Sequence, residues 1–351
     1  MNKISLPFKV HSQALDEFMS RPSQAVLESL QASEGDVLVL GAGGKMGLHV
    51  CLMLQRAFEE LQESGGAKRE VIAVSRFGGE GARDVFEREG LRTIAADLCD
   101  QQQLDTLPDA PSVIFLAGVK FGTSHDPDLL NKMNVEMPAL VASRFRNSRV
   151  VALSTGCVYS FTACKSGGSS ESAGEVNPTG DYARSCLGRE QAFVQASEQW
   201  GTKCSLIRLN YAIDLRYGVL HDIAQKVIAG QPVDVSMGYV NLIWQRDAIA
   251  HCIQALNHAA SPAFVLNVTG SEILSVRDLA IRFGEALAMD VEIEGEEAEL
   301  GWLSDSSKAC ELFGEPEVSI EQMIEWTAAW LQSGGESLGK PTHFETRDGK
   351  Y

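Results

Sequence analysis

The sequence predicts an α/β protein built on a doubly wound parallel sheet, with a smaller region toward its C-terminal end. Three observations lead to this fold class. Short apolar runs alternate with helical patterns, a glycine-rich turn joins the first run to the first helix, and 351 residues are enough for a sheet domain plus an appended region. Strands that alternate with helices form parallel sheets. Right-handed crossovers then place helices on both faces of the sheet.

The apolar runs define six strands, and the segments between them define four helices. The first run, Val37-Leu38-Val39-Leu40, is fully apolar, as expected for a strand that is buried on both faces. Residues 155–180 are rich in glycine, serine and cysteine and are expected to form a loop. The expected strands are residues 37–40, 71–74, 91–96, 112–117, 149–153 and 203–208. The expected helices are residues 45–63, 80–90, 126–146 and 182–200.

The two ends of the chain and the region past residue 210 are less regular. Residues 14–30 have helical spacing that Arg21-Pro22 interrupts. Past residue 210, helical patterns lie within 218–230 and at 246–258 and 275–289, with a strand-like run at 264–268. We therefore divide the chain into residues 1–34 as a helical extension, 35–210 as the core sheet, 211–333 as a mainly separate region whose late elements can return to the core, and 334–351 as a polar tail.

Three glycines follow the first strand with the spacing G-x-x-G-x-x-G, at Gly41, Gly44 and Gly47. In a strand–turn–helix unit the first glycine permits a tight turn, the second lets the backbone approach a pyrophosphate, and the third lets helix and strand pack closely. The N-terminus of the helix then faces the phosphates. The turn, including Lys45 and Met46, is therefore predicted to bind a dinucleotide, which makes residues 35–210 a Rossmann-type core. A tight turn in another kind of α/β protein is the alternative.

Composition excludes several function classes. The net charge of −17 argues against nucleic acid or an anionic membrane as a partner, because both require a cationic surface. No run of 18 apolar residues occurs, and residues 1–12 lack an apolar signal core. The eight cysteines form no C-x-x-C pair and are expected to be reduced thiols in a cytoplasmic protein. The seven histidines show no metal-ligand spacing, so no metal site is expected.

Further motifs occur in order along the chain. Phe115-Leu116-Ala117-Gly118 ends the fourth strand, and Ser154-Thr155 begins an S-[ST]-x-x-V-Y pattern. Other matches are Asp97-Leu98 after the third strand, Asn134 in the helix 126–146, Tyr182 at the start of the helix 182–200, and the segments 207–210 and 245–248. Together with the glycine spacing, they resemble the extended short-chain dehydrogenase/reductases, the NAD(P)-dependent epimerase/dehydratase group, over residues 36–331 approximately.

The resemblance implies an NAD(P)-dependent oxidoreductase or epimerase that acts on a hydroxyl or carbonyl group of a sugar-like substrate, such as a nucleotide sugar. It implies that Tyr182 is the catalytic acid or base and that the Thr155 hydroxyl orients the same substrate oxygen. It also implies a homodimer through helices 127–146 and 182–200, with Leu140, Val141 and Phe145 on either the dimer face or the sheet face. The implied cofactor contacts are Asp97, Leu98, Leu116, Ala117, Gly118, Asn134 and Ser154.

One position departs from the family pattern. The family has a lysine four residues after the catalytic tyrosine, which lowers the pKa of the phenol and holds the nicotinamide ribose, and this chain has Cys186 there. Without a cation the phenol keeps a pKa of about 10 or higher. Three alternatives follow. Either Lys120 or Lys165 supplies a substitute cation, or other acid–base residues act in the same pocket, with or without net redox turnover. In the third alternative, the protein is a sensor or regulator that binds NAD(P) without turnover. Arg184 points away from Tyr182 on the helix.

The end of the second strand bears on the form of the cofactor. NAD enzymes usually have an acidic residue there, whereas an arginine accommodates the 2′-phosphate of NADP. Here the strand ends in Val74-Ser75-Arg76, so we favour NADP, with NAD as the alternative. For the substrate, the resemblance indicates Lys120, Asn210, Arg216 and Arg246, with Tyr211 nearby and Trp244 as a stacking surface or a core residue.

Overall fold

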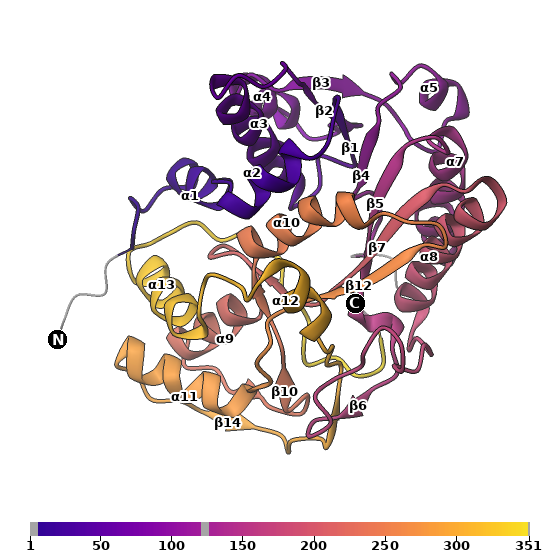
Figure 1. Cartoon of the computed structure of the whole chain (residues 1–351). Coiled ribbons are helices and arrows are strands. Elements are labelled where there is room, and N and C mark those ends of the chain that lie inside the picture. The colour runs from indigo at the N-terminus through magenta and orange to yellow at the C-terminus, as the bar shows by residue number, and fades with distance from the viewer. Residues whose placement is uncertain (1–5, 121–125, 350–351) are drawn as a thin grey trace.

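The central element of the structure, a computed structural model, is a seven-stranded sheet in which every strand is parallel to its neighbours (Figure 1). The structure describes residues 6–120 and 126–349. The strand order is β12-β7-β5-β4-β1-β2-β3, so the chain winds outward from β1 in one direction and from β4 in the other. The strands are β1 Val37–Leu40, β2 Val71–Ser75, β3 Arg92–Ala95, β4 Ser112–Phe115, β5 Arg149–Thr155, β7 Lys203–Leu209 and β12 Phe264–Val268. The doubly wound parallel fold is therefore confirmed.

Helices cover both faces of this sheet (Figure 1). Alternate residues of β1 point to opposite faces: Val37 and Val39 pack against one group of helices, and Leu38 and Leu40 pack against the other. The first group comprises α2 Gln24–Gln31, α3 Gly47–Glu63, α4 Ala82–Arg88 and α10 Gln245–Gln254. The second comprises α5 Gln101–Asp105, α7 Met137–Arg144 and α8 Asp181–Trp200. Because α10 and β12 lie past residue 210, the C-terminal half contributes directly to the core sheet domain.

The helix expected at 126–146 is interrupted. It consists of α6 Pro127–Asn131, a π-helical turn η1 Lys132–Glu136 and then α7. π-helical turns often mark functional sites, and this one carries the buried Asn134. On α7, Val141 and Phe145 are 0% and 2% exposed and pack into the core, so they do not form a dimer face. The homodimer itself stays a prediction.

A second core holds the C-terminal region together, and it includes the N-terminal extension. Helices α9 Val219–Ile228, α11 Val276–Leu287 and α13 Ile320–Gln332 pack around it, grouped below the sheet in Figure 1. Helix α1, Ser12–Met19, contributes Leu15 and Met19 to this core, whereas α2 packs on the sheet domain. The extension therefore connects the two cores.

Short elements complete the chain. The paired strands of the C-terminal region are two residues long each and support the loops around the sheet edge. They are β6 Thr162–Ala163, β8 Ala212–Ile213, β9 Val233–Asp234, β10 Tyr239–Val240, β11 Ile243–Trp244, β13 Leu274–Ser275, β14 Ile293–Glu294 and β15 Leu300–Gly301. The other short helices are η2 Gly156–Val158, η3 Ala255–His258 and α12 Ser307–Phe313.

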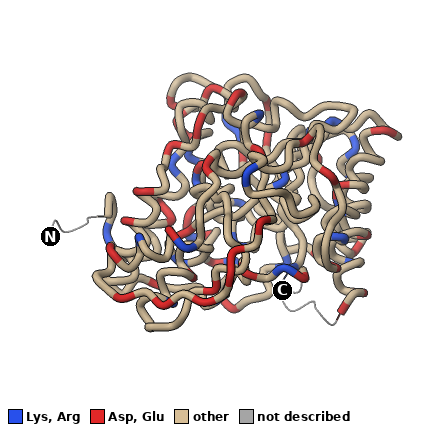
Figure 2. The backbone as a smooth tube through the Cα atoms, turned by 90° about the horizontal axis from the view of Figure 1, so that it is seen from below, with Lys and Arg blue, Asp and Glu red and all other residues tan. Residues whose placement is uncertain are grey.

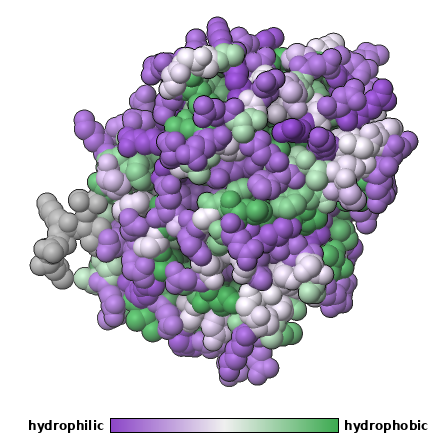
Figure 3. Space-filling view, in the orientation of Figure 1, coloured by the Kyte–Doolittle hydropathy of each residue, from purple (hydrophilic) through white to green (hydrophobic). Residues whose placement is uncertain are grey.

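The surface agrees with an acidic globular chain. Figure 2 shows acidic and basic residues interspersed along the backbone, and Figure 3 shows a largely hydrophilic face with small hydrophobic areas. Within 6–120 and 126–349, none of the helices combines the length and apolarity that crossing a bilayer requires.

The glycine turn after β1 is sterically demanding. Gly41 has φ +85°, and a Cβ there would lie 2.5 Å from the amide nitrogen of Ala117. A Cβ on Gly47 would lie 2.0 Å from the carbonyl oxygen of Ala42. At Gly44, by contrast, a Cβ would meet only the carbonyl oxygen of Gly41, at 3.2 Å. The turn therefore requires glycine at its first and third positions to bring α3 against β1.

We predict that Gly47→Ala lowers the free energy of unfolding by about 1–3 kcal/mol, because the added methyl group collides with fixed backbone. Gly44→Ala is the matched control and should change stability by less than half as much. Urea denaturation followed by circular dichroism measures both. Equal stability of the two variants would contradict the packing role of Gly47.

Candidate active site

Two adjoining cavities lie at the carboxyl ends of the central strands, at the point where the chain winding reverses between β1 and β4. Open α/β sheets bind ligands at this position. One cavity, of about 290 Å³, is lined by Thr155 and Tyr182, and we call it the Tyr182 cavity. The other, of about 560 Å³, is lined by Ser75 and Arg76, and we call it the Arg76 cavity. Gly44, Leu116 and Gly118 line both, so the two form one continuous groove.

The groove brings together most of the residues that the sequence predicts for the site. The Tyr182 cavity also contains Lys45, Met46, Gly47, Lys120, Ser154 and Asn210. The Arg76 cavity also contains Gly41, Asp97, Leu98 and Ala117. Asn134, Arg216 and Arg246 line neither cavity.

The glycine turn at the junction fits a dinucleotide. Gly44 lines both cavities, so a side chain there would project into the junction between them. The N-terminal turn of α3 follows directly, and no side chain caps it. Uncapped backbone N–H groups at a helix N-terminus are suited to binding phosphate. The residues present therefore match the pyrophosphate of a dinucleotide.

The Arg76 cavity has no carboxylate at the end of β2. Val74 is followed by Ser75, which closes the strand, and then by the exposed Arg76. The acidic residue in this cavity, Asp97, accepts a hydrogen bond from the Cys99 amide (3.0 Å) and follows β3 rather than β2. A cation and a hydroxyl therefore occupy the place where a ribose-binding acid is usual.

Tyr182 lies in the first turn of α8, one turn before Cys186, and the two side chains are hydrogen-bonded. Burial raises the pKa of Tyr182 well above its ordinary value, and Cys186 raises it further, while the guanidinium of Arg189 opposes the shift. Burial also raises the pKa of the Cys186 thiol. Both groups are therefore protonated at neutral pH in the ligand-free protein. Thr155 faces the same cavity, and its hydroxyl accepts a hydrogen bond from the Cys157 amide (3.2 Å).

Two lysines reach the Tyr182 cavity. The ammonium of Lys120 lies 5.7 Å from the centroid of the Tyr182 ring. The ammonium of Lys45 lies 3.5 Å from the centroid of the Tyr217 ring. Burial lowers the pKa of Lys45 to about 7, although the Asp214 carboxylate opposes this shift.

The other two basic residues considered for the missing lysine lie elsewhere. Lys165 is exposed and does not line the cavity. Arg184 is exposed and forms an ion pair with Asp181 (2.7 Å) on its own helix. The structure thus brings Lys120, and not Lys165, to Tyr182.

Asn134 supports the cavity from behind rather than contacting a ligand. Its side-chain oxygen accepts hydrogen bonds from the Val119 amide (2.9 Å) and from Arg189 (2.7 Å). Its amide nitrogen donates to the Val119 carbonyl (2.9 Å) and to the Ser185 hydroxyl (2.9 Å). The sequence predicts a cofactor contact, but every polar atom of this buried amide is engaged by the protein. Asn134 therefore fixes the segment that carries Lys120.

Arg216 and Arg246, which the sequence predicts to bind substrate, line neither cavity and are held in ion pairs. Arg216 is bound by Asp214 (2.9 Å) and by Asp16 of α1 (2.8 Å). Arg246 pairs with Glu317 (2.9 Å) and donates to the Arg21 carbonyl (2.9 Å). Arg246 has partners that are distant in the sequence. Arg216 has one distant partner, Asp16, and one nearby partner, Asp214. Similarly, Trp244 is 0% exposed and packs against Phe18 and Trp326, so it is a core residue and not a stacking surface.

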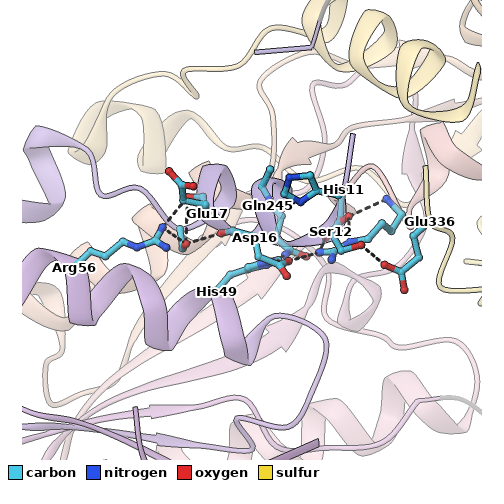
Figure 4. Close-up of polar contacts among 12 residues, drawn as sticks. His11, Ser12, Asp16, Glu17, His49, Arg56, Gln245 and Glu336 are labelled. Carbon is cyan, nitrogen blue, oxygen red and sulfur yellow. Dashed lines mark hydrogen bonds and ion pairs between the residues drawn. The ribbon is translucent and has the colours of Figure 1, made fainter. Parts of the chain in front are cut away.

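The N-terminal extension is tied to the start of α3 by polar contacts that the sequence gives no sign of. Figure 4 shows Asp16 directed at His49, and the two side chains are 2.8 Å apart. His49 in turn contacts the Gln245 amide nitrogen (2.7 Å). Ser12, at the start of α1, hydrogen-bonds to Glu336 of the C-terminal segment. Helix α1 therefore contacts both the first turn of α3 and Glu336 of the C-terminal segment.

The segment 334–349 is not a free tail but part of the cavity wall. Thr342 lines the Tyr182 cavity and donates both its amide and its hydroxyl to Asp222 (2.7 and 2.6 Å). Phe344 is 1% exposed within the second core. Gly349 packs against Gly180, just before Tyr182, where a Cβ on Gly180 would lie 2.5 Å from its carbonyl oxygen. Its few apolar residues made this packing hard to predict from sequence.

Comparison with known proteins agrees with this geometry. Residues 37–261 match the NAD dependent epimerase/dehydratase family. No curated protein that was compared matches the chain. Similar solved structures include a UDP-glucuronic acid 4-epimerase from Bacillus cereus in complex with NAD, at 18% identity and a TM-score of 0.70, covering 86% of this chain and 100% of that one.

Two further structures are similar over comparable lengths. A UDP-glucose 4-epimerase from Thermus thermophilus in complex with NAD has 20% identity and a TM-score of 0.67. A UDP-galactose 4-epimerase has 20% identity and a TM-score of 0.65. Each comparison covers 85% of this chain and 99% of the other. At these identities the likeness establishes the shared fold.

The buried Asp214–Arg216 pair leads to a pH-dependent stability. Burial alone would raise the pKa of Asp214, but the hydrogen bonds and charge of Arg216 outweigh it and lower the pKa to about 2. With an unfolded pKa of about 3.9, the pair stabilises the fold by about 2–3 kcal/mol above pH ~4, and this contribution is lost as the pH falls toward ~2.

We therefore predict that Asp214→Asn destabilises the protein by about 2 kcal/mol at neutral pH, with the deficit shrinking below pH ~4. Urea denaturation at a series of pH values measures this. Asp109→Asn is the matched control, because Asp109 is 91% exposed in its pair with Arg144 and should contribute little. A deficit for Asp214→Asn that is independent of pH would contradict the assignment.

Proposed function

Because the chain belongs to the NAD dependent epimerase/dehydratase family, we propose that it is an NADP-dependent oxidoreductase or epimerase that acts on a hydroxyl or carbonyl group of a sugar-like substrate. One observation carries this proposal. A single groove places the glycine turn at its centre, with Ser75 and Arg76 in one cavity and Thr155 and Tyr182 in the other. This is the order in which an extended dinucleotide would meet ribose-binding, phosphate-binding and catalytic groups.

The dinucleotide would be held by the chain's own backbone and charges. The turn Gly41–Gly47 and the first turn of α3 would receive the pyrophosphate, and the Arg76 cavity would receive the adenosine half. The nicotinamide, when bound, supplies the acceptor or donor of hydride. The protein's part is to orient the substrate beside it and to handle the proton on the reacting oxygen.

Tyr182 and Thr155 are the groups proposed for that proton. A protonated Tyr182 can donate to a substrate carbonyl oxygen, and Thr155 can hold the same oxygen in place. In the opposite direction Tyr182 must accept a proton, which requires a cation that stabilises the phenolate. The same pair therefore serves both directions only if a positive charge replaces the lysine that is absent at Cys186.

The walls of the Tyr182 cavity suit a sugar-like substrate. Asn210 is fixed by hydrogen bonds from its amide nitrogen to Asn241 (2.8 Å) and to the Trp302 carbonyl (3.2 Å). Tyr211 and Tyr217 add aromatic surface and hydroxyl groups. Apolar faces combined with a few placed hydrogen-bonding groups are typical of small-molecule sites. The similar epimerases act on UDP-sugars by their names, and a nucleotide sugar is the substrate class we propose to test first.

A second function is favoured by one observation. Tyr182 is buried beside a thiol with its pKa raised, which suits a protein that binds the dinucleotide without turning it over. Such a sensor or regulator would bind the cofactor normally but leave it chemically unchanged in the presence of every substrate offered. Binding and turnover must therefore be measured separately.

We predict that the protein binds NADPH more tightly than NADH and that Arg76→Ala removes this preference. A charge-assisted hydrogen bond to the 2′-phosphate contributes about 1.5–3 kcal/mol. The Kd for NADPH should therefore rise roughly 10- to 100-fold, with little change for NADH. Fluorescence titration of the reduced cofactors measures both constants.

The matched control is Arg88→Ala, which removes an equal charge from α4, where Arg88 donates only to the Asp84 carbonyl (3.2 Å). It should leave both constants nearly unchanged. A preference for NADH in the unmodified protein would overturn the NADP assignment, and failure to bind either cofactor would overturn the proposed function.

A further inference from the structure

A lysine from a different part of the chain stands beside the tyrosine whose family partner is missing. On α8, Tyr182 and Arg189 line the cavity, and the buried Cys186 lies between them in the sequence. Cys186 is 0% exposed, and burial keeps its thiol neutral, so it supplies no positive charge. A phenolate at Tyr182 therefore needs a cation from another part of the chain. The role of that cation in catalysis rests on the proposed function, whereas its effect on the ionisation of Tyr182 does not.

Lys120 occupies the appropriate place. It follows β4, lines the same cavity as Tyr182, and holds its ammonium 5.7 Å from the centroid of the tyrosine ring. Burial lowers the pKa of Lys120, and the carboxylate of Asp222 opposes this shift.

The backbone that carries Lys120 is held firmly. Asn134 bonds both the amide and the carbonyl of Val119, at 2.9 Å each. At Gly118, a Cβ would lie 2.1 Å from the guanidinium of Arg189, so only glycine lets the strand end pass this close to α8. Gly118 and Val119 are therefore fixed against α8 and the π-helical turn, and they hold the backbone of Lys120 beside Tyr182.

Two other cations line the cavity. Lys45 packs on the ring of Tyr217 at 3.5 Å. Arg189 donates to the Leu153 carbonyl (3.0 Å) and to Asn134 (2.7 Å), and its charge opposes the rise in the pKa of Tyr182. The charged and titratable groups that face Tyr182 and Lys120 are thus Cys157, Cys186, Arg189, Asp222 and Lys45.

We propose that Lys120 replaces the lysine that is absent at Cys186, as the cation that stabilises the Tyr182 phenolate and so allows Tyr182 to exchange a proton with the substrate oxygen. When a substrate alcohol is oxidised, its O–H proton passes to Tyr182 Oη, and a bound oxidised nicotinamide would supply the acceptor for the C–H hydride. In the reverse direction the same proton returns to the carbonyl oxygen. Lys120 keeps its proton throughout and acts by its charge.

The test measures the ionisation of Tyr182 directly and does not depend on turnover. The protein is labelled with ¹³C at the tyrosine ring carbon that bears the hydroxyl, and its NMR shift is followed against pH, with Tyr182→Phe identifying the signal. Lys120→Ala should move the midpoint for Tyr182 upward by on the order of one pH unit, because a cation 5.7 Å from the ring centroid has been removed. Lys165→Ala removes an exposed lysine off the cavity and should leave the midpoint unchanged.

Relocating the lysine separates a charge effect from a loss of structure. In the double variant Lys120→Ala/Cys186→Lys, a lysine stands one helical turn after Tyr182, and the midpoint should return toward that of the unmodified protein. Circular dichroism and urea denaturation confirm that each variant is folded. A midpoint that Lys120→Ala does not move, or that the double variant fails to restore, would overturn the inference.

Binding of NADPH, followed by fluorescence, is measured in parallel on the same variants. Loss of binding in the unmodified protein would count against the proposed function but would leave the Tyr182 midpoint as an independent test of Lys120. Normal binding with an unmoved midpoint would count against Lys120 alone.

Discussion

The close approach of backbone around the glycine turn is the constraint on which the site depends. Gly41 abuts Ala117, two residues after β4, and Gly47 abuts Ala42 of the turn itself, so α3 starts close to the ends of β1 and β4. Because β1 and β4 are neighbours in the sheet, the two halves of the groove meet at the same point. Side chains at these positions would separate α3 from the strands, and the groove would no longer be continuous.

Charge compensation around this groove explains why distant segments converge on it. Behind the Tyr182 cavity, Ser154 donates to Glu190 (2.6 Å), and Glu190 is paired with the buried Arg208 (2.7 Å). On the other side, Arg216 is held between Asp214 and Asp16. Unpaired buried charges are costly, so each of these guanidinium groups needs its carboxylate.

The ends of the chain are part of this arrangement, although the family match begins only at residue 37. Asp16 of α1 contacts the first turn of α3 through His49. Thr342 lines the Tyr182 cavity and is bound to Asp222, and Gly349 packs against Gly180 just before α8. Residues outside the family match therefore contribute to the cavity lining and pack beside the start of α8.

The sequence predicted the sheet well because β1, β2 and β4 are mostly apolar runs that are buried, and because the glycine turn lies between a strand and a helix. It also predicted Tyr182 and Thr155, which the structure places in one cavity. It did not predict the π-helical turn at Asn134, since the apolar pattern there is continuous, and it did not predict α13. The ion pairs of Arg216 and Arg246 could not be predicted because an arginine in a sequence does not reveal its carboxylate partner. Asp16 and Thr342 act through contacts with residues far away in the sequence.

A crystal structure of the unmodified protein with NADPH would test the central claim most directly. The account predicts the pyrophosphate at the N-terminus of α3, the 2′-phosphate beside Ser75 and Arg76, and the nicotinamide in the Tyr182 cavity next to Thr155. A dinucleotide bound away from the Gly41–Gly47 turn, or one whose nicotinamide lies outside the Tyr182 cavity, would contradict it.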